Sequence, residues 1–276
     1  MTTDFAATDP ATTEDLIPAE RQQRLVHWFR DNQSGSNQDL ARMLNTSVST
    51  IRRDLDTLAA QGLVRRTHGG AVSVRRMTTW EPTVVEAQKT AVEEKRAIAL
   101  EAARRLEPGQ SILLDTGSML YEFAQVIAGM TLPLTIVTND VHIASTLSRT
   151  SHLRLIVPGG TCRPRANALL GEPGLSFLKE LRCDRLFFSV QAIDQECLSD
   201  TYLDLVQLKL AMMASARAST LLIDSSRFDA RALHRVCGLE TLDEIITDEG
   251  LAESEARSYG DLGIAITRVS VGSAAD

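Results

Sequence analysis

The fold of the N-terminal part is decided by residues 47–55, which read SVSTIRRDL. Apolar residues recur in this stretch at helical spacing, so that Ile51 and Leu55 share one face of a helix turning by about 100° per residue. Ser49 and Arg53 point to nearly the opposite side. The stretch therefore predicts an amphipathic helix with one buried face and one polar, cationic face.

A shorter helix is predicted just before it, at residues 37–44, where apolar residues again have helical spacing. Ser36 is placed to cap the start of this helix, and residues 45–46 form a tight turn between the two helices. Two short helices joined by such a turn, here over about 36–55, are typical of the helix-turn-helix, whose second helix lies in the major groove of DNA.

Residues 63–71, which read LVRRTHGGA, predict a β-hairpin wing whose basic side chains contact backbone phosphates. With a first helix expected over 20–30, residues 20–74 form a winged helix-turn-helix of the α+β class. We expect Arg53 to pair with a guanine, because an arginine fork matches two acceptors of that base. The residues predicted to contact DNA are Ser47, Ser49, Thr50, Arg52, Arg53, Thr57, Arg65, Arg66 and His68.

An alternative interpretation is a solvated helix face that binds no DNA. In that case Arg52 and Asp56, four residues apart, form an ion pair on the helix surface. The carboxylates of Asp54 and Asp56 favour this alternative, because like charges repel and DNA phosphates are negative.

The distribution of charge favours DNA binding once the chain is divided by region. The net charge of −7 is opposite in sign to that of a simple DNA-binding protein. Residues 20–76, however, hold ten basic and five acidic residues, while residues 1–19 hold four acidic and no basic ones. A short basic module attached to an acidic body is typical of a nucleic-acid binder with a separate effector domain.

The composition, with 43% hydrophobic and 24% charged residues, is that of a globular protein. No apolar run approaches the ~18 residues of a membrane-spanning helix. Residues 1–19 lack the pattern of a signal peptide, and we expect them to be a disordered acidic tail on a cytoplasmic protein. No disulfide framework or metal site is predicted, because no C-x-x-C pair occurs among Cys162, Cys183, Cys197 and Cys237.

After a linker expected over 75–92, apolar runs alternate with helical patterns from residue 93 to residue 270. The predicted strands are 111–115, 134–138, 153–157, 185–189, 220–224, 244–247 and 263–268. This alternation predicts an α/β effector domain with a mostly parallel sheet. Ligands bind in such sheets beyond the carboxyl ends of the strands.

Small and polar residues follow several of these predicted strands. The Asp-Thr-Gly-Ser run at 115–118 leads into a helix, whose first N–H groups can bind an anion. Hydroxyls, amides and carboxylates at the other strand ends suit a phosphorylated polar ligand, although each turn taken singly also fits an ordinary helix cap. The effector-binding residues predicted at these strand ends are Asp115, Thr116, Gly117, Ser118, Thr138, Asn139, Gly159, Gly160 and Asp224.

Residues 47–55 and 66–71 (RTHGGA) together resemble the signature of the DeoR family of sugar-operon repressors. The strand ends, with Lys209 as a further effector-binding residue, resemble the sensor domain of that family, which is similar in fold to ribose-5-phosphate isomerase and the CoA-transferases. The resemblance covers about residues 20–250. It implies a repressor that binds double-stranded operator DNA, is released by a phosphorylated sugar or related metabolite, and forms a homo-oligomer (a dimer or tetramer), with no cofactor, metal or membrane involved.

The chain departs from the family pattern at two places in the sensor domain. Residues 188–194 read FSVQAID where the family has a glycine-containing segment, and Arg227 replaces a lysine. Side chains in place of glycine are expected to narrow the crevice and so change which effector fits it.

The competing interpretation is an active sugar-phosphate isomerase fused to a DNA-binding module. Aldose–ketose isomerisation needs a carboxylate base, which the isomerases carry in the segment matching 188–192 and directly before the position of Lys209. Neither place holds Asp or Glu here, and Leu208 precedes the lysine. The resemblance therefore implies a sensor and no enzyme.

Overall fold

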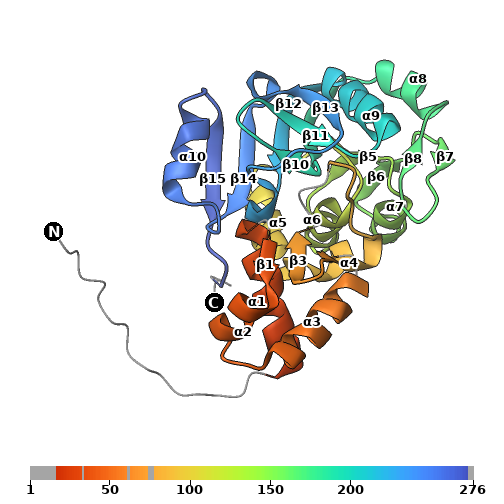
Figure 1. Ribbon diagram of the computed structural model, residues 1–276. Coiled ribbons are helices and arrows are strands. Elements are labelled where there is room, and N and C mark those ends of the chain that lie inside the picture. Colours follow the sequence, from red (N-terminus) through yellow and green to blue (C-terminus); the bar gives the residue numbers. More distant parts are fainter. Residues whose placement is uncertain (1–16, 33, 61–62, 74–77, 273–276) are drawn as a thin grey trace. The chain divides into compact units, whose positions relative to one another are not determined.

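The computed structural model divides the chain into two compact units, Met1–Arg75 and Arg76–Asp276 (Figure 1). Residues 1–16, which make up most of the tail expected over 1–19, lie outside the described part of the chain. The structure describes residues 17–32, 34–60, 63–73 and 78–272.

The N-terminal unit combines three helices with a three-stranded antiparallel sheet of order β1-β3-β2. Its elements are α1 (Pro18–Asp31), β1 (Ser34–Ser36), α2 (Asn37–Met43), α3 (Val48–Ala60), β2 (Val64–Arg66) and β3 (Gly70–Ser73). The predicted helix-turn-helix and wing are present. Strand β1 is an addition, because its stretch is rich in turn-forming residues and predicted no strand.

The core of this unit explains why its helices form where they do. Helix α3 buries Ile51, Leu55 and Leu58, as the helical spacing predicted. The hydroxyl of Ser36 accepts a hydrogen bond from the backbone N–H of Asp39 at 3.1 Å, which confirms the predicted cap of α2.

A glycine in the wing allows two strands to approach closely. Gly35 lies on β1, which pairs with β3, and Gly70 lies on β3. A Cβ atom added to Gly70 would lie 1.9 Å from the carbonyl oxygen of Gly35. Any side chain at this position would therefore separate β1 from the wing.

The C-terminal unit contains seven α-helices among the described residues: α4 (Val84–Lys89), α5 (Val92–Ala103), α6 (Ser118–Ala128), α7 (Val141–Leu147), α8 (Gly174–Lys179), α9 (Leu203–Ala214) and α10 (Glu253–Gly260). Its main sheet is formed by β4 (Ser111–Leu114), β5 (Leu134–Thr138), β6 (Leu153–Ile156), β9 (Cys183–Phe188), β12 (Ala216–Leu222), β14 (Glu244–Asp248) and β15 (Ala265–Val269). The shorter elements are β7 (Thr161–Cys162), β8 (Leu169–Leu170), β10 (Ala192–Ile193), β11 (Cys197–Asp200), β13 (His234–Gly238) and the 3-10 turns Ser225–Arg227 and Leu239–Thr241.

The seven strands of the main sheet run in the order β15-β14-β12-β9-β4-β5-β6, and every neighbouring pair is parallel. These are the seven strands that the apolar runs predicted, so the α/β class with a parallel sheet is confirmed. The chain leaves β4 toward β5 and β6, and then returns to β9 on the other side of β4. The strand order therefore reverses between β4 and β9, which is where open parallel sheets bind ligands.

Each face of the sheet has its own hydrophobic core, because successive strand residues point to opposite faces. On β4, Leu113 packs in the core covered by α8, α9 and α10. Its neighbours Ile112 and Leu114 pack in the core covered by α5, α6 and α7. The sheet is thus the middle layer of three.

The segment expected to be a linker, 75–92, contains helix α4. Thr83 and Glu86 form a capping box at its start: the Thr83 backbone N–H donates to Glu86 Oε2 at 2.8 Å, and Glu86 N–H donates to the Thr83 hydroxyl at 3.3 Å. None of the helices in the described part of the chain is both long and apolar enough to span a membrane.

Candidate DNA-binding and effector sites

The outer face of α3 presents hydroxyls and free cations. The Ser47 hydroxyl lies 2.8 Å from the hydroxyls of Ser49 and Thr50, and it accepts the Thr50 backbone N–H at 3.1 Å, which fixes the start of the helix. Arg52 and Arg53 are exposed, and among the described residues no partner is recorded for either guanidinium. The face is therefore open to an anionic partner.

Asp54, which the sequence placed among the residues unfavourable for DNA binding, faces the interior. Its carboxylate is buried and accepts hydrogen bonds from Arg21 Nε at 2.5 Å and from Gln22 Nε2 at 3.1 Å. The carboxylate therefore ties α1 to α3 and contributes no exposed negative charge to the outer face.

The two arginines of the wing have different environments. Arg65 is exposed, whereas the guanidinium of Arg66 donates to the carbonyl of Gly70 at 2.6 Å and pairs with Asp56 at 2.8 Å. Asp56 thus pairs with the wing, and the alternative pair with Arg52 is not formed. The remaining wing residue predicted to contact DNA, His68, is exposed.

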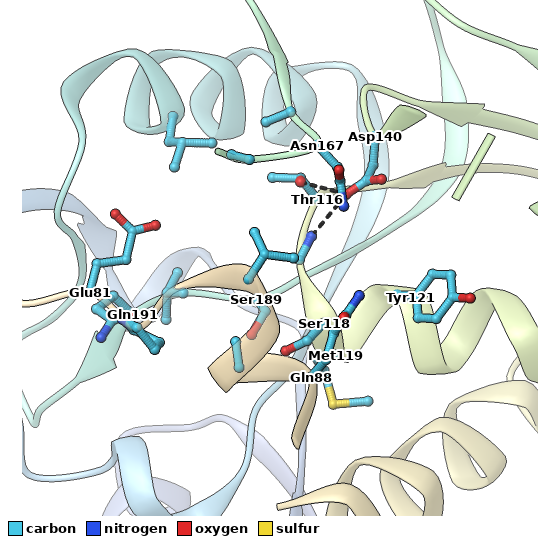
Figure 2. A pocket seen from close by; sticks show the side chains of 18 of the residues that line it. Glu81, Gln88, Thr116, Ser118, Met119, Tyr121, Asp140, Asn167, Ser189 and Gln191 are labelled. Carbon is cyan, nitrogen blue, oxygen red and sulfur yellow. Dashed lines mark hydrogen bonds between the residues drawn. The ribbon is translucent and has the colours of Figure 1, made fainter. Parts of the chain in front are cut away.

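A cavity of about 130 Å³ lies beyond the carboxyl ends of β4, β5, β9 and β12 (Figure 2). Its walls come from the turns that follow these strands, from α9, and from the segment that contains α4. This is the edge of the sheet at which the strand order reverses, so the cavity has the position expected of a ligand site.

The N-terminus of α6 forms one end of the cavity (Figure 2). Gly117 precedes the helix with φ of 118°, a conformation that favours glycine. The Thr116 hydroxyl donates to Asp140 Oδ2 at 2.7 Å, and the Gly117 N–H donates to the same oxygen at 3.3 Å. The other oxygen of Asp140 caps α7 by accepting the His142 N–H at 2.8 Å.

Lys209 is buried beside the ends of β4 and β9, between two carboxylates. Its ammonium group donates to the carbonyl of Ser189 at 2.8 Å, pairs with Asp115 and lies 3.6 Å from Asp200. Burial alone would lower the pKa of Lys209, but the two carboxylates outweigh it and raise the pKa. Burial raises the pKa of Asp200. The charge of Lys209 is therefore balanced within the protein.

Two further cations of the cavity wall are hydrogen-bonded within the protein. Arg227 donates to Asp224 at 3.2 Å and to Gln191 Oε1 at 2.9 Å. Lys95 donates to the carbonyl of Thr90 at 2.6 Å and to that of Ala87, and burial lowers its pKa to about 8. The cavity is thus lined by charges of both signs, of which Lys209 and Arg227 form ion pairs while Lys95 is held by backbone carbonyls.

The structure brings about half of the predicted effector-binding residues to the cavity. Thr116, Gly117, Ser118, Lys209 and Asp224 line it. Asp115 lies directly behind the wall, where it pairs with Lys209.

The other four predicted residues do not reach the cavity. Thr138 is fully buried and its hydroxyl accepts the Asp140 N–H, while Asn139 donates to the carbonyl of Leu169. Gly159 and Gly160 have positive φ, and a Cβ on Gly160 would lie 2.7 Å from the Leu170 carbonyl oxygen. Gly160 therefore serves the packing against β8, whereas Gly159 lies against Pro173 at the start of α8.

Among the charged residues of the cavity wall, Glu81, Lys95, Arg163 and Asp200 were not predicted from the sequence. None of them directly follows a strand of the main sheet, where polar turn residues were expected to bind the ligand. Of these four residues, only Arg163 could have been found from the sequence, because it lies three residues after Gly160, in the segment that follows β6.

Comparison with known families covers both units. The model of the DeoR C terminal sensor domain matches residues 90–249, and that of the DeoR-like helix-turn-helix domain matches residues 21–77. The chain belongs to the DeoR family. This DeoR-family protein is therefore a DNA-binding transcriptional regulator with a sensor domain for a small molecule.

Characterised relatives extend over nearly the whole chain. The HTH-type transcriptional regulator GlpR of Haloferax volcanii is 33% identical over 91% of this chain and 98% of its own. The glycerol-3-phosphate regulon repressor of Escherichia coli is 30% identical over 83% of this chain and 90% of its own. Among solved structures, ribose 5-phosphate isomerase A of Methanocaldococcus jannaschii matches with a TM-score of 0.39 and 15% identity, over 50% of this chain and 55% of that one.

Proposed function

We propose that this DeoR-family regulator represses a sugar or carbohydrate operon and leaves its operator when a phosphorylated sugar or related metabolite occupies the cavity. The observation that carries the proposal is the cavity itself, which opens at the carboxyl edge of the sheet beside the N-terminus of α6. The name of one relative, the glycerol-3-phosphate regulon repressor, also supports the control of genes for a small phosphorylated metabolite.

The phosphate is assigned to the first turn of α6. Backbone N–H groups at a helix start have no partner within the helix and attract anions. The Ser118 hydroxyl lines the cavity at this point, and nothing lies within 4 Å of a Cβ built on Gly117, so the backbone is accessible. Asp140 occupies the N–H of Gly117 only, which leaves the N–H groups of the first helical turn for phosphate oxygens.

The sugar hydroxyls are assigned to the paired charges around the rest of the cavity. Carboxylates such as Asp200 and Asp224 accept hydrogen bonds from hydroxyl groups, and the guanidinium of Arg227 donates them. The positive and negative charges of the wall nearly cancel, so the wall does not select a ligand by net charge alone. It favours a polar ligand whose hydroxyl groups match the positions of these side chains.

On DNA, we assign base contacts to Arg53, and phosphate contacts to Arg52 and Arg65. Ser47, Ser49, Thr50, Thr57 and His68 stay candidate contacts. Arg66 is expected to hold the wing to α3, since its guanidinium is already engaged there. We also propose that the protein is a homo-oligomer, a dimer or a tetramer, because helix-turn-helix proteins commonly bind repeated half-sites as symmetric oligomers. Its proposed place of action is the cytoplasm, where operator DNA lies.

Catalysis is the second candidate, because carboxylates do line the cavity. The carboxylate Asp200 lies beside Lys209, near the place where the sequence argument expected none. It is engaged by the lysine and by the Thr201 N–H at 2.9 Å, and Asp224 is engaged by Arg227. Both carboxylates keep lone pairs that can accept a hydrogen bond from a ligand, as assigned above. The relatives that extend over most of the chain are named a transcriptional regulator and a regulon repressor, and we therefore infer that the domain binds its ligand without converting it.

The test combines ligand binding, operator release and turnover. Thermal unfolding of the full chain is followed with a panel of sugar phosphates, since a ligand that prefers the folded state raises the melting temperature. Hits are then titrated into an operator gel shift, and each is incubated with the protein to look for product. A stabilising sugar phosphate that releases the operator and is recovered unchanged supports the proposal. Steady turnover, or release by no member of the panel, contradicts it.

A further inference from the structure

One carboxylate in the cavity wall comes from the segment that leads out of the wing. Glu81 accepts two parallel hydrogen bonds from the guanidinium of Arg163, at 3.0 and 2.8 Å, and a third from the Thr201 hydroxyl at 2.9 Å. Both Glu81 and Arg163 line the cavity. These contacts, together with the charge of Arg227, lower the pKa of Glu81 although burial opposes them.

Arg163 is held as an anion receptor by groups other than Glu81. Its guanidinium lies 4.3 Å from the centre of the Tyr202 ring, a cation–π contact that orients the fork. Its backbone N–H donates to the carbonyl of Ala168 at 2.8 Å, across the β7–β8 turn. A fork held in this way binds carboxylates and phosphates bidentately with equal ease. The anion now bound there belongs to the protein itself.

Residues 78–91, here called the strap, contribute Glu81, Pro82, Val84, Ala87 and Gln88 to the cavity wall. The carbonyl of Trp80 accepts a hydrogen bond from Gln191 Nε2 at 3.3 Å, and Lys95 holds the carbonyls of Ala87 and Thr90. Glu81 lies only eight residues after Ser73, the last residue of the wing strand β3. A change at Glu81 is therefore close, along the chain, to the DNA-binding unit.

We propose that Glu81 is an internal anionic ligand of Arg163, and that an anionic group of the effector displaces it and thereby frees the strap. The inference rests on the proposed function only in taking the cavity as the effector site. It adds a second anion site, formed by Arg163 and Thr201, to the one at α6. It also supplies a link to DNA binding, since the displaced residue belongs to the segment that continues into the wing.

The expected size of the effect follows from competition. While Glu81 occupies Arg163, the apparent affinity for an external anion is reduced by the fraction of molecules in which the fork is free. A bidentate, partly exposed pair that is closed in about 80–90% of molecules weakens external binding roughly five- to tenfold. Replacing the carboxylate by an amide of the same shape should restore that factor.

The experiment uses the full chain with Trp28→Phe, so that Trp80 in the strap is the only tryptophan. Inorganic phosphate and acetate are titrated separately, with chloride as the control for ionic strength, while Trp80 fluorescence and binding heat are recorded. The variants are Glu81→Gln, Arg163→Gln and the double variant. Glu253→Gln is the matched control, because it removes a carboxylate from an exposed pair with Arg257 on α10.

Glu81→Gln is expected to bind its preferred anion about five- to tenfold more tightly, and to show without anion the Trp80 emission that wild type shows at saturation. The gain should vanish in the double variant and be absent in Glu253→Gln. The anion whose affinity increases, phosphate or acetate, shows whether the effector group that binds Arg163 is a phosphate or a carboxylate. An unchanged or weaker affinity of Glu81→Gln for both anions overturns the proposal, because Glu81 is then an anchor and no competitor.

The two proposals fail in different ways. If sugar phosphates release wild-type protein from its operator but Glu81→Gln gains no anion affinity, only the Glu81 inference is wrong. If Glu81→Gln binds the anion more tightly but no sugar phosphate releases the operator, the anion site stands and the proposed effector class is wrong.

Discussion

The ammonium nitrogen of Lys209 lies 3.6 Å from Oδ2 of Asp200, and both side chains are almost completely buried. Asp115 pairs with the same ammonium group and is fully buried. One ammonium group thus lies between two buried carboxylates, and burial raises the pKa of one of them, Asp200. The cluster is a structural part of the sensor domain as well as a part of the cavity wall.

Lys209→Met should destabilise the C-terminal unit, because it leaves two buried carboxylates without a cation. Removing one partner of a buried ion pair typically costs about 3–5 kcal/mol, and we expect a loss of that order. Urea unfolding followed by Trp80 fluorescence, in the Trp28→Phe background, measures it. Lys179→Met, at the exposed end of α8, is the control and should change the unfolding free energy by less than about 0.5 kcal/mol. A comparably small loss for Lys209→Met would contradict the assignment.

The buried Lys95 should make stability rise with pH. Burial lowers its pKa from 10.5 to about 8, so between these values the unfolded chain binds the proton more tightly than the folded one. The unfolding free energy therefore increases with pH in this window, by up to about 3 kcal/mol in total. Urea unfolding of wild type and Lys95→Met at pH 7, 8, 9 and 10 tests this. The difference between the two should grow above pH 8, and parallel curves would show that Lys95 keeps its ordinary pKa.

Arg53→Ala should weaken binding to the operator far more than binding to random DNA. If Arg53 pairs with a guanine, its removal costs about 1–3 kcal/mol on the specific site. Fluorescence anisotropy with both DNAs at several salt concentrations gives the two affinities. Arg65→Ala is the comparison, since loss of a phosphate contact should weaken all sequences alike and reduce the salt dependence by about one counterion. Equal loss on both DNAs for Arg53→Ala would exclude base recognition.

Ser118→Glu should give a regulator that binds its operator normally but is no longer released. A carboxylate in the first turn of α6 occupies the helix start and repels the phosphate of the effector, while the N-terminal unit is unchanged. A gel-shift titration with a sugar phosphate found in the thermal screen tests this, and the same variant should lose the thermal shift. Ser145→Glu, exposed on α7, controls for the added charge. Release of Ser118→Glu at the wild-type effector concentration would place the phosphate elsewhere.

Local sequence patterns predicted most of the fold because the features concerned are local. Helical spacing located the buried face of α3 and the cap at Ser36, and continuous apolar runs located the seven parallel strands. The small sheet of β10, β11 and β13 was not predicted, because its strands are short and carry no distinct alternation. Nor was the helix in the strap, although its capping box at Thr83 and Glu86 was present in the sequence.

The cavity was predicted less completely, because charge pairs depend on the tertiary fold. Glu81 and Arg163 are 82 residues apart, and Asp115 and Lys209 are 94 apart. No periodicity relates such positions. The resemblance also implied that Lys209 binds the effector, whereas its ammonium group is already engaged by two adjacent carboxylates.

The cavity wall shares only a few residues, such as Val190 and Leu205, with the two cores of the C-terminal unit. The cores consist mainly of strand and helix side chains, while most of the wall comes from turns after strands and from the strap. Partly exposed turn residues accept substitutions at a small cost in stability, whereas buried positions such as Lys209 do not. In the course of evolution the same scaffold can therefore acquire a new inducer through mutations of the partly exposed wall residues, while the buried residues keep the fold.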